Sequence, residues 1–427
     1  MITAEVKLWG TTVGTVYLPE GERFARFEYD KKFISGGVEI SPVNMPLSAN
    51  VYTFTALPLN TFQGLPGLLA DSLPDKFGNA VINAWLVSQN REPDSMNAVE
   101  KLCYIGKRGM GALEYYPSVS DDLNVSEAVN VAELIRLAGE ILAKRERLHL
   151  HADNSLISNL IRVGTSAGGA RAKAVIAWNE ETNEIRSGQV DAGEGFGYWI
   201  LKFGDIAGNR DKEQEDRHNY TVIEYAYYLM ARAAGIEMSE CMLFESEGSR
   251  HFMTRRFDRI GERGEKLHMQ SLGALAHFDF NSPGTYSYEQ AAQVMLRLGL
   301  GQAAMEQLYR RMVFNIMARN QDDHVKNISF LMNKKGEWSL APAYDMTYAY
   351  NPGGKWTGSH QMTVNGKREG FTEDDLKQCG ENMNIKAKKC GEIIAEVRAA
   401  VMKWHEFAED AGLPEDECES IRKVLLV

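Results

Sequence analysis

Hydrophobic residues recur at helical spacing through much of the second half of the chain. Residues 304–319 place Leu308, Met312 and Ile316 on one face and contain neither proline nor glycine, which predicts a helix. We expect the apolar residues at 393–407, the last stretch with this spacing, to pack into the core rather than to form a partner surface. The same spacing is found over residues 128–144, 221–234 and 393–407.

Short apolar runs predict strands in other parts of the chain. Residues 328–332 and 338–341 flank a polar stretch that ends in Gly336, which is typical of a hairpin with a glycine-bearing turn. The chain from residue 287 onward is predicted to be mainly helical apart from this hairpin. Further strands are predicted at residues 6–9, 13–17, 174–178 and 198–203.

The loop between the 304–319 helix and the hairpin carries side chains suited to phosphoryl transfer. Residues 319–327 read Arg-Asn-Gln-Asp-Asp-His-Val-Lys-Asn. In kinases a loop Asp orients the attacking hydroxyl, an Asn five residues later holds a metal ion, and an Asp beyond two short strands binds metal on the phosphates. Asp322, Asn327 and Asp345 have that spacing. A solvated polar turn is the ordinary alternative for the loop taken alone.

A glycine-rich segment upstream is suited to hold phosphate groups. Gly164, Gly168 and Gly169 precede Arg171 and Lys173 and lead into a predicted strand. Glycines let backbone N–H groups approach phosphate oxygens, and the two cations add positive charge. The segment matches neither the Walker pattern nor the glycine loop of eukaryotic protein kinases, so an ordinary turn between strands remains the alternative.

A single lysine ends the apolar run at residues 198–203. Lys202 is therefore a candidate for the contact with the α- and β-phosphates of ATP, the alternative being an edge-strand lysine in solvent. Glu224, on the helix predicted to begin at Thr221, is the candidate ion-pair partner. Thr221 and Glu224 also have the spacing of a capping box, in which Glu224 would bond the backbone instead.

Six motifs occur in one order, and together they carry a family resemblance. With residues 67–75 and 105–112 of the N-terminal third, they resemble the HipA family of bacterial serine/threonine kinase toxins over nearly the whole chain. The motifs are Ser166-Ala-Gly-Gly-Ala-Arg-Ala-Lys173, Ile200-Leu-Lys202, Arg256-Phe-Asp-Arg259, His268-Met-Gln-Ser-Leu272, Asp322-Asp-His-Val-Lys-Asn327 and Tyr344-Asp345.

The resemblance implies an α+β fold, namely a two-lobed protein-kinase-like fold with an additional N-terminal α/β subdomain and a mainly helical C-lobe. We expect a HipA-type N-terminal subdomain at residues 1–120 and a nucleotide-binding lobe with a glycine-rich loop at residues 121–257. The helical C-lobe with the catalytic loop would follow at residues 258–427. The polar residues 117–124 are the candidate linker.

The resemblance also implies an activity and partners. Such a chain would transfer phosphate from ATP, with Mg²⁺, to a serine or threonine of a protein such as an aminoacyl-tRNA synthetase. A small helix-turn-helix antitoxin would hold it inactive, and DNA would be contacted mainly through that antitoxin.

Carried over by position, the resemblance assigns a role to each matching residue. Ser166 takes the position of the autophosphorylated serine, whose modification ejects the glycine-rich loop. The magnesium ligands would be Asn327 and Asp345. The catalytic-loop residues would be Asp322, His324, Lys326 and Asn327. The ATP-binding residues would be Gly168, Gly169, Ala170, Arg171, Ala172, Lys173, Lys202, Glu224, Arg255, Arg256, Phe257 and Tyr344.

Two positions depart from the family pattern. Asp323 stands where a glycine is commoner, which puts a second carboxylate beside the proposed base and questions which of the two orients the nucleophile. Arg255 replaces an acidic residue at the hinge, which puts the side-chain part of adenine recognition in doubt. Backbone contacts at the hinge would survive that change.

Composition narrows the location and the partners. The 427 residues are 44% hydrophobic with no membrane-length apolar run, so we expect a cytoplasmic protein that does not enter a membrane. The net charge of −11 argues against an extended nucleic-acid surface. The odd number and wide spacing of the five cysteines predict reduced, structural thiols.

Two other functions share part of this pattern. A catalytically idle kinase fold could act as a corepressor and binding partner of a DNA-binding antitoxin. The presence of Lys202, Asp322, Asn327 and Asp345 favours an active enzyme over that reading. A small-molecule kinase of the aminoglycoside or choline type shares the Asp and Asn loop but leaves the N-terminal motifs and Ser166 unexplained.

Overall fold

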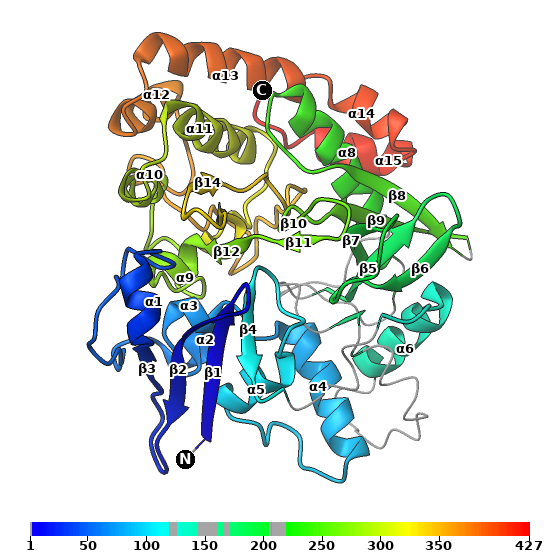
Figure 1. Ribbon diagram of the computed structural model, residues 1–427. Helices are drawn as coiled ribbons and strands as arrows, with labels where there is room; N and C mark the ends of the chain where they lie inside the picture. Colours follow the sequence, from blue (N-terminus) through cyan, green and yellow to red (C-terminus); the bar gives the residue numbers. More distant parts are fainter. Residues whose placement is uncertain are drawn as a thin grey trace.

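The computed structural model describes residues 2–118, 126–143, 161, 163–164, 171–204, 206, 219–246 and 248–427. The chain folds around three main apolar cores (Figure 1). We call the three regions the N-terminal subdomain (residues 2–118), the five-stranded lobe (residues 126–204 and the strands at 241–255) and the helical lobe (residues 219–234 and 268–427). Helical and antiparallel-sheet regions are largely separate, as in α+β proteins.

The N-terminal subdomain is built on an antiparallel sheet of order β3-β2-β1-β4. Trp9 and Gly10 join the first two strands with φ of 49° and 82°, the left-handed conformations that a tight hairpin turn requires. The elements are β1 (Ile2–Leu8), β2 (Thr11–Leu18), β3 (Arg26–Tyr29), α1 (Lys31–Gly36), α2 (Leu59–Phe62), α3 (Gly67–Ala70), α4 (Lys76–Ser88), α5 (Ala98–Ile105) and β4 (Leu113–Tyr116).

The five-stranded lobe is an antiparallel sheet of order β6-β5-β7-β9-β8, drawn in green at the right of Figure 1. The strand ending in Lys202 is central, and Lys173 and Lys202 lie directly opposite each other across β5 and β7. The elements are α6 (Val131–Ala143), β5 (Lys173–Asn179), β6 (Glu184–Ser187), β7 (Gly197–Lys202), β8 (Cys241–Ser246) and β9 (Ser249–Arg255).

One helix of the N-terminal subdomain packs into the five-stranded lobe. Phe77 and Val81 of α4 share an apolar core with Ile176 and Leu201 of the sheet and with α6. This core therefore crosses residue 120, where the sequence predicts a domain boundary. The two regions consequently share buried side chains as well as a surface contact.

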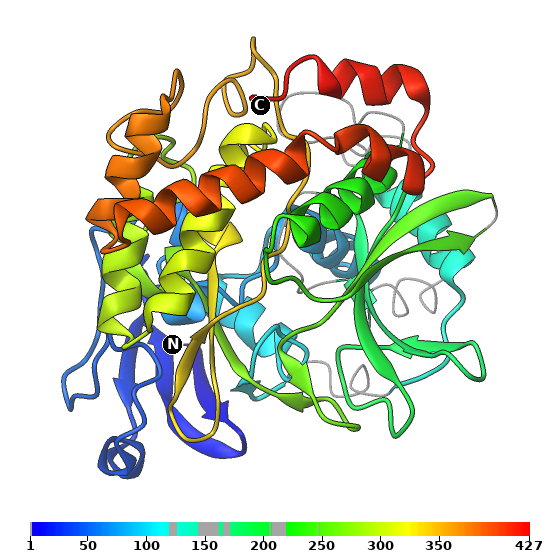
Figure 2. The ribbon, with the colours of Figure 1, turned by 90° about the horizontal axis from the view of Figure 1, so that it is seen from above.

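The helical lobe contains the third core and lies at the top of Figure 1. Seen from above, α13 crosses over α11 (Figure 2), and the two helices are in contact. The elements are α8 (Tyr220–Ala233), β12 (His268–Ser271), α9 (Leu272–Ala276), α10 (Tyr288–Arg297), α11 (Gln302–Met317), η2 (Val325–Asn327), β13 (Ser329–Met332), β14 (Trp338–Leu340), α12 (Glu373–Asn382), α13 (Ala387–Val401), α14 (Trp404–Asp410) and α15 (Glu415–Arg422). A small pair, β10 (Arg259–Ile260) and β11 (Glu265–Lys266), connects it to the five-stranded lobe.

Several local predictions are confirmed here. The predicted helix at 304–319 is α11, and the predicted hairpin is β13 and β14, with Gly336 at φ 81°. The apolar pattern at 393–407 is split into α13 and α14, which lets Trp404 pack against Tyr227 with ring centroids 5.2 Å apart. Its apolar residues lie in the core, and all five cysteines are buried and unpaired.

The N-terminal subdomain also docks on the helical lobe. His268 Nε2 lies 3.0 Å from the carbonyl oxygen of Ile40, and Trp338 Nε1 donates to that of Glu39. These contacts join the subdomain to β12 and β14, beside the predicted catalytic loop.

Among the described helices, none is both long and apolar enough to cross a membrane.

Candidate active site

The predicted catalytic loop begins where α11 ends and is fixed at both ends. Arg319 has φ of 56°, which turns the chain out of the helix. Gln321 then donates its N–H to the carbonyl of Ala349, in a short parallel pairing with the segment that follows Asp345. Val325 anchors the other end of the loop in the helical core. The loop and Asp345 are thereby held together by backbone contacts.

Inside the loop, Asn327 and Asp322 are joined directly. The side-chain Nδ2 of Asn327 donates to the Asp322 carbonyl at 2.9 Å, and the His324 N–H donates to the same oxygen. This bond uses the donor end of the Asn327 amide, whereas a metal ion would need the acceptor end. The Asp322 carboxylate is about a quarter exposed, and Nε2 of His324 lies 3.9 Å from it.

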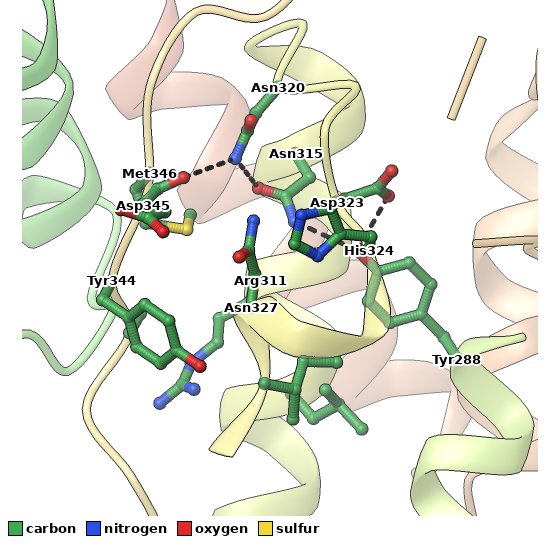
Figure 3. Close-up of a pocket in the computed structure, with 13 residues that line it drawn as sticks. Tyr288, Arg311, Asn315, Asn320, Asp323, His324, Asn327, Tyr344, Asp345 and Met346 are labelled. Atoms are coloured by element: carbon green, nitrogen blue, oxygen red, sulfur yellow. Dashed lines mark hydrogen bonds between the residues drawn. The ribbon is translucent and has the colours of Figure 1, made fainter. Parts of the chain in front are cut away.

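Asp323 is buried, and its carboxylate has three hydrogen-bond partners, of which Figure 3 shows Tyr288. Its Oδ2 accepts from the Tyr288 hydroxyl and lies 2.9 Å from Nδ1 of His360, and its Oδ1 accepts the Gln361 N–H. The two neighbouring carboxylates of the loop therefore differ in burial and in hydrogen bonding. Asp323 anchors the loop and lines the pocket beside Asn327, whereas the Asp322 side chain is 26% exposed.

The anchoring contacts of Asp323 continue to the backbone of Asp345. Asn315 donates to the Tyr288 hydroxyl, and Asn320 donates both to Asn315 Oδ1 and to the Asp345 carbonyl. A pocket beside this chain of bonds is lined by residues that include Asn327 and Asp345. A hydrogen-bonded network inside the helical lobe thus fixes the relative positions of the loop and Asp345.

Lys202 is held between two carboxylates at the edge of the sheet. Its Nζ lies 2.5 Å from Oε1 of Glu224 and also bonds Oδ1 of Asp345. The edge-strand alternative is wrong, because β7 is a central strand and the Lys202 side chain is 11% exposed. The capping-box alternative is wrong too, because the Thr221 hydroxyl donates to the Arg250 carbonyl and Glu224 turns to Lys202.

The charges of this cluster support one another. Burial alone would lower the pKa of Lys202, but Asp345 and Glu224 together raise that pKa above its ordinary value. Burial raises the pKa of Glu224 despite the nearby ammonium. Burial raises the pKa of Asp345, but Lys202 and Lys173 lower it below its ordinary value. This carboxylate is therefore ionised at neutral pH. Its φ of 52° is a left-handed conformation, uncommon outside glycine and often found at functional sites.

The glycine-rich segment is only partly described. Ser166, Gly168, Gly169 and Ala170 lie outside the described residues. The Arg171 guanidinium lies 4.4 Å from the ring centroid of Tyr220, and the Ala172 carbonyl accepts from Phe203 N–H, which extends the β5–β7 pairing by one step. Lys173 and Lys202 are the two cations that the sheet places side by side.

At the predicted hinge, the side chains of Arg255 and Arg256 each pair with a carboxylate. The Arg255 side chain is more than half exposed and contacts Glu240, whereas its backbone N–H binds the Glu240 carbonyl. The Arg256 guanidinium is buried and binds both Asp258 and the Gly188 carbonyl. An ATP contact of the Arg255–Phe257 segment stays a prediction. The ring centroid of Phe257 lies 5.6 Å from that of Tyr344.

Comparison with known proteins matches most of the chain to models of one family. A model of the HipA-like C-terminal domain matches residues 165–404, more than half of the chain, and a model of the HipA N-terminal domain matches residues 4–116. The chain belongs to the HipA family. The α+β, two-lobed fold with an extra N-terminal subdomain is thereby established as the fold of a HipA protein.

Individual relatives are distant. The structure of Shewanella oneidensis HipA, in complex with HipB and operator DNA, superposes with a TM-score of 0.69 at 15% identity and covers 98% of this chain and 94% of that one. A Haemophilus influenzae protein named "Putative kinase" is 28% identical over 135 residues, which span 29% of this chain and 39% of that protein. The Helicobacter pylori proinflammatory kinase CtkA gives a TM-score of only 0.40 at 13% identity.

The residues present fit a magnesium-bound nucleotide. Within the described part of the chain, no three His, Cys, Asp or Glu side chains form a cluster that could hold a metal alone. Mg²⁺ commonly takes one or two protein ligands together with substrate phosphates and water. Asn327 and Asp345 line one pocket, and Lys202 and Lys173 provide positive charge beside Asp345.

Two parts of the site were missed by sequence reasoning. Asp75, at the start of α4, forms a buried ion pair with Lys173. Asp258 binds Arg256, Arg259 and the Gly111 N–H, which joins the hinge to the N-terminal subdomain. Burial would raise the pKa of Asp258, but the two guanidiniums hold it well below its usual range. The only available signal was that both residues fall inside motifs of the HipA resemblance.

Proposed function

We propose that this HipA-family chain is an ATP- and Mg²⁺-dependent protein serine/threonine kinase and the toxin of a toxin–antitoxin pair. The observation that carries the proposal is Lys202, which is held between Glu224 and Asp345 beside the Asp322–Asn327 loop. A lysine paired with a helix carboxylate and close to a metal-binding Asp is the arrangement that active kinases require.

Each residue of the cleft then has a chemical task. Lys202 and Lys173 bind phosphate oxygens, and Phe257 and Tyr344 flank the base. Asp322 accepts or orients the proton of the attacking hydroxyl, and His324 and Lys326 complete the loop around it. Asn327 and Asp345 would hold Mg²⁺, which would neutralise charge on the phosphates.

The proposed partners follow from the family and from charge. A small helix-turn-helix antitoxin would bind the chain, and an acidic protein of net charge −11 would contact DNA mainly through that antitoxin. The protein substrate, for which an aminoacyl-tRNA synthetase is the leading candidate, would offer a serine or threonine to Asp322. Ser166 is proposed as the site of self-phosphorylation, whose phosphate would repel the ATP polyphosphate.

One experiment tests this proposal. The purified chain is incubated with Mg-ATP and a cell lysate, and phosphosites are mapped by mass spectrometry beside an Asp322→Asn control. We expect phosphate on one lysate protein and on Ser166 with the wild-type chain alone. No new phosphosite on either, from a chain that binds Mg-ATP, would contradict the kinase proposal and favour the corepressor function.

A further inference from the structure

One charge pair at the cleft joins the N-terminal subdomain to the five-stranded lobe. Oδ2 of Asp75 lies 3.3 Å from Nζ of Lys173, and both side chains are more than nine-tenths buried. Oδ1 of the same carboxylate accepts the Gly78 N–H and caps α4. One oxygen therefore fixes the helix, and the other meets the lysine.

The position of Asp75 is rigidly defined. Residues Phe77 and Val81, on the first turns of α4, lie in the same apolar core as Ala174 and Ile176 of β5. The capping carboxylate and the start of β5 are thus held by packing on both sides. A substitution at Asp75 would therefore change the position of the Lys173 ammonium directly, because the two side chains are in contact.

Lys173 lies beside the lysine already placed at the phosphates. It is the direct antiparallel partner of Lys202, so the two side chains emerge from the same face of the sheet. Lys202 is balanced by Glu224 and Asp345, both outside the N-terminal subdomain. The ion pair of Lys173 comes from the N-terminal subdomain.

The two ammonium groups depend on these carboxylates. Burial lowers the pKa of Lys173, the neighbouring Lys202 lowers it further, and Asp75 and Asp345 raise it. Burial likewise raises the pKa of Asp75, while Lys173 lowers it. Each member of the pair therefore favours the charged form of the other, as expected for buried opposite charges.

We propose that Asp75 is a positioning residue for the nucleotide: it holds Lys173 beside Lys202, so that the N-terminal subdomain forms part of the phosphate-binding site. The inference rests on the proposed function in assuming that ATP phosphates bind at these lysines. A phosphate oxygen arriving at Lys173 would meet an ammonium that is already oriented. The subdomain would then be required for nucleotide affinity as well as for the fold.

The test is a cycle of variants in the full chain. Asp75→Asn removes the charge but keeps an N-cap, because Asn caps helices about as well as Asp. Asp30→Asn is the matched control, since Asp30 caps α1 through the N–H groups of Lys32 and Phe33, and the structure records no ion pair for it among the described residues. Lys173→Met and the Asp75→Asn/Lys173→Met double variant complete the cycle.

Calorimetric titration with a non-hydrolysable Mg-ATP analogue and the ATP dependence of phosphorylation are the readouts. We expect Asp75→Asn to raise the Kd about tenfold, a change of ~1.4 kcal/mol, and to raise KM in parallel while kcat changes less than threefold. Asp30→Asn should bind like the wild type. The double variant should bind no more weakly than Lys173→Met alone, because Asp75 acts through the lysine.

The outcomes separate this inference from the proposed function. Unchanged Kd in Asp75→Asn, or an equal further loss in the Lys173→Met background, overturns the positioning role while leaving the kinase proposal intact. A wild-type chain that binds no Mg-ATP analogue overturns both. Thermal melting of the four apo variants measures the ion pair without nucleotide. Should Asp75→Asn be unfolded, Asp75→Ser, which also caps a helix without a charge, takes its place in the cycle, with the same outcomes for and against the positioning role.

Discussion

The two halves of the proposed active site are held in place by different forces. On the helical-lobe side, the loop is fixed by a network inside one lobe that links Asp323, Tyr288 and Asn320 to the Asp345 backbone. On the sheet side, Lys202 and Lys173 are fixed by ion pairs to carboxylates from other parts of the chain.

The difference indicates which half responds to a ligand. Hydrogen bonds within one packed lobe hold the loop in a single geometry that a nucleotide need not change. An ammonium group that is paired with a carboxylate can exchange it for a phosphate oxygen, because both partners are negatively charged. We therefore infer that the catalytic loop is preorganised, as is Lys173 beside Asp75, whereas Lys202 exchanges Asp345 for phosphate when polyphosphate binds.

The largest expected effect is a loss of phosphoryl transfer when a carboxylate of the loop side is removed. Asp322→Asn or Asp345→Asn should reduce phosphoryl transfer by about a hundredfold to ten-thousandfold, the scale for a lost acid–base or metal contact. Asn tolerates the left-handed backbone of residue 345, so the fold should persist. Steady-state kinetics and circular dichroism check this, with exposed Asp374→Asn as the control. Transfer within tenfold of wild type would remove that residue from the mechanism.

A smaller effect is expected on the lysine side. Lys202→Met should weaken Mg-ATP binding about tenfold and lower the free energy of unfolding by about 3 kcal/mol, because Glu224 is left buried without its partner. A surface cation would affect stability little, and burial of Lys202 changes that expectation. Urea unfolding and ATP titration provide the measurements. Lys388→Met, at a position 90% exposed, is the control, and equal stability of the two variants would contradict the buried pair.

Acid should loosen the contact between β12 and the N-terminal subdomain. Burial lowers the pKa of His268 to about 4, below the unfolded value near 6.5. The folded state therefore binds fewer protons between these values, so the stability present above pH 6.5 is lost as pH falls toward 4. The loss attributable to His268 should approach about 3 kcal/mol at pH 4.

His268→Gln should flatten that part of the pH profile. Stability curves in urea between pH 7 and 4, measured for the wild type and the variant, give the difference. His405, half exposed on α14, provides the control His405→Gln. Parallel curves for wild type and His268→Gln would show that His268 does not titrate as a buried neutral group.

The smallest effect on transfer is expected at Asp323. Asp323→Asn replaces one acceptor oxygen with a donor, so one of its three hydrogen bonds is lost inside the lobe. The free energy of unfolding should fall by about 2 kcal/mol, while kcat falls less than tenfold because Asp322 is untouched. Kinase assays measure kcat, and urea unfolding measures the free energy of unfolding. A larger loss of kcat than in Asp322→Asn would reverse the roles of the two carboxylates.

Local features of this chain were predictable because their causes are local. The apolar spacing of 304–319 fixes α11, and the five-residue interval from Asp322 to Asn327 lets the two groups meet across one short turn. The Lys202–Glu224 pair followed from a strand and a helix adjacent in sequence, although the capping-box spacing competed with it.

Contacts that depend on packing could not be predicted in this way. Asp75 meets Lys173 only because α4 packs on the five-stranded sheet. The sequence around either residue does not indicate that they form an ion pair. His360 likewise meets Asp323 through the long segment before α12. The pairing of the Arg256 guanidinium with Asp258, two residues away, was also not foreseen, although both residues lie in one motif.

The buried carboxylate of Asp258 has a consequence for how HipA proteins can be recombined. It receives two guanidiniums from its own segment and the Gly111 N–H from the N-terminal subdomain, while Arg259 also donates to the carbonyls of Gly109 and Gly111. A chimera that takes this subdomain from another family member must therefore reproduce the backbone path of residues 109–111. Otherwise Asp258 loses one buried donor, the Gly111 N–H, and Arg259 loses two buried carbonyl acceptors.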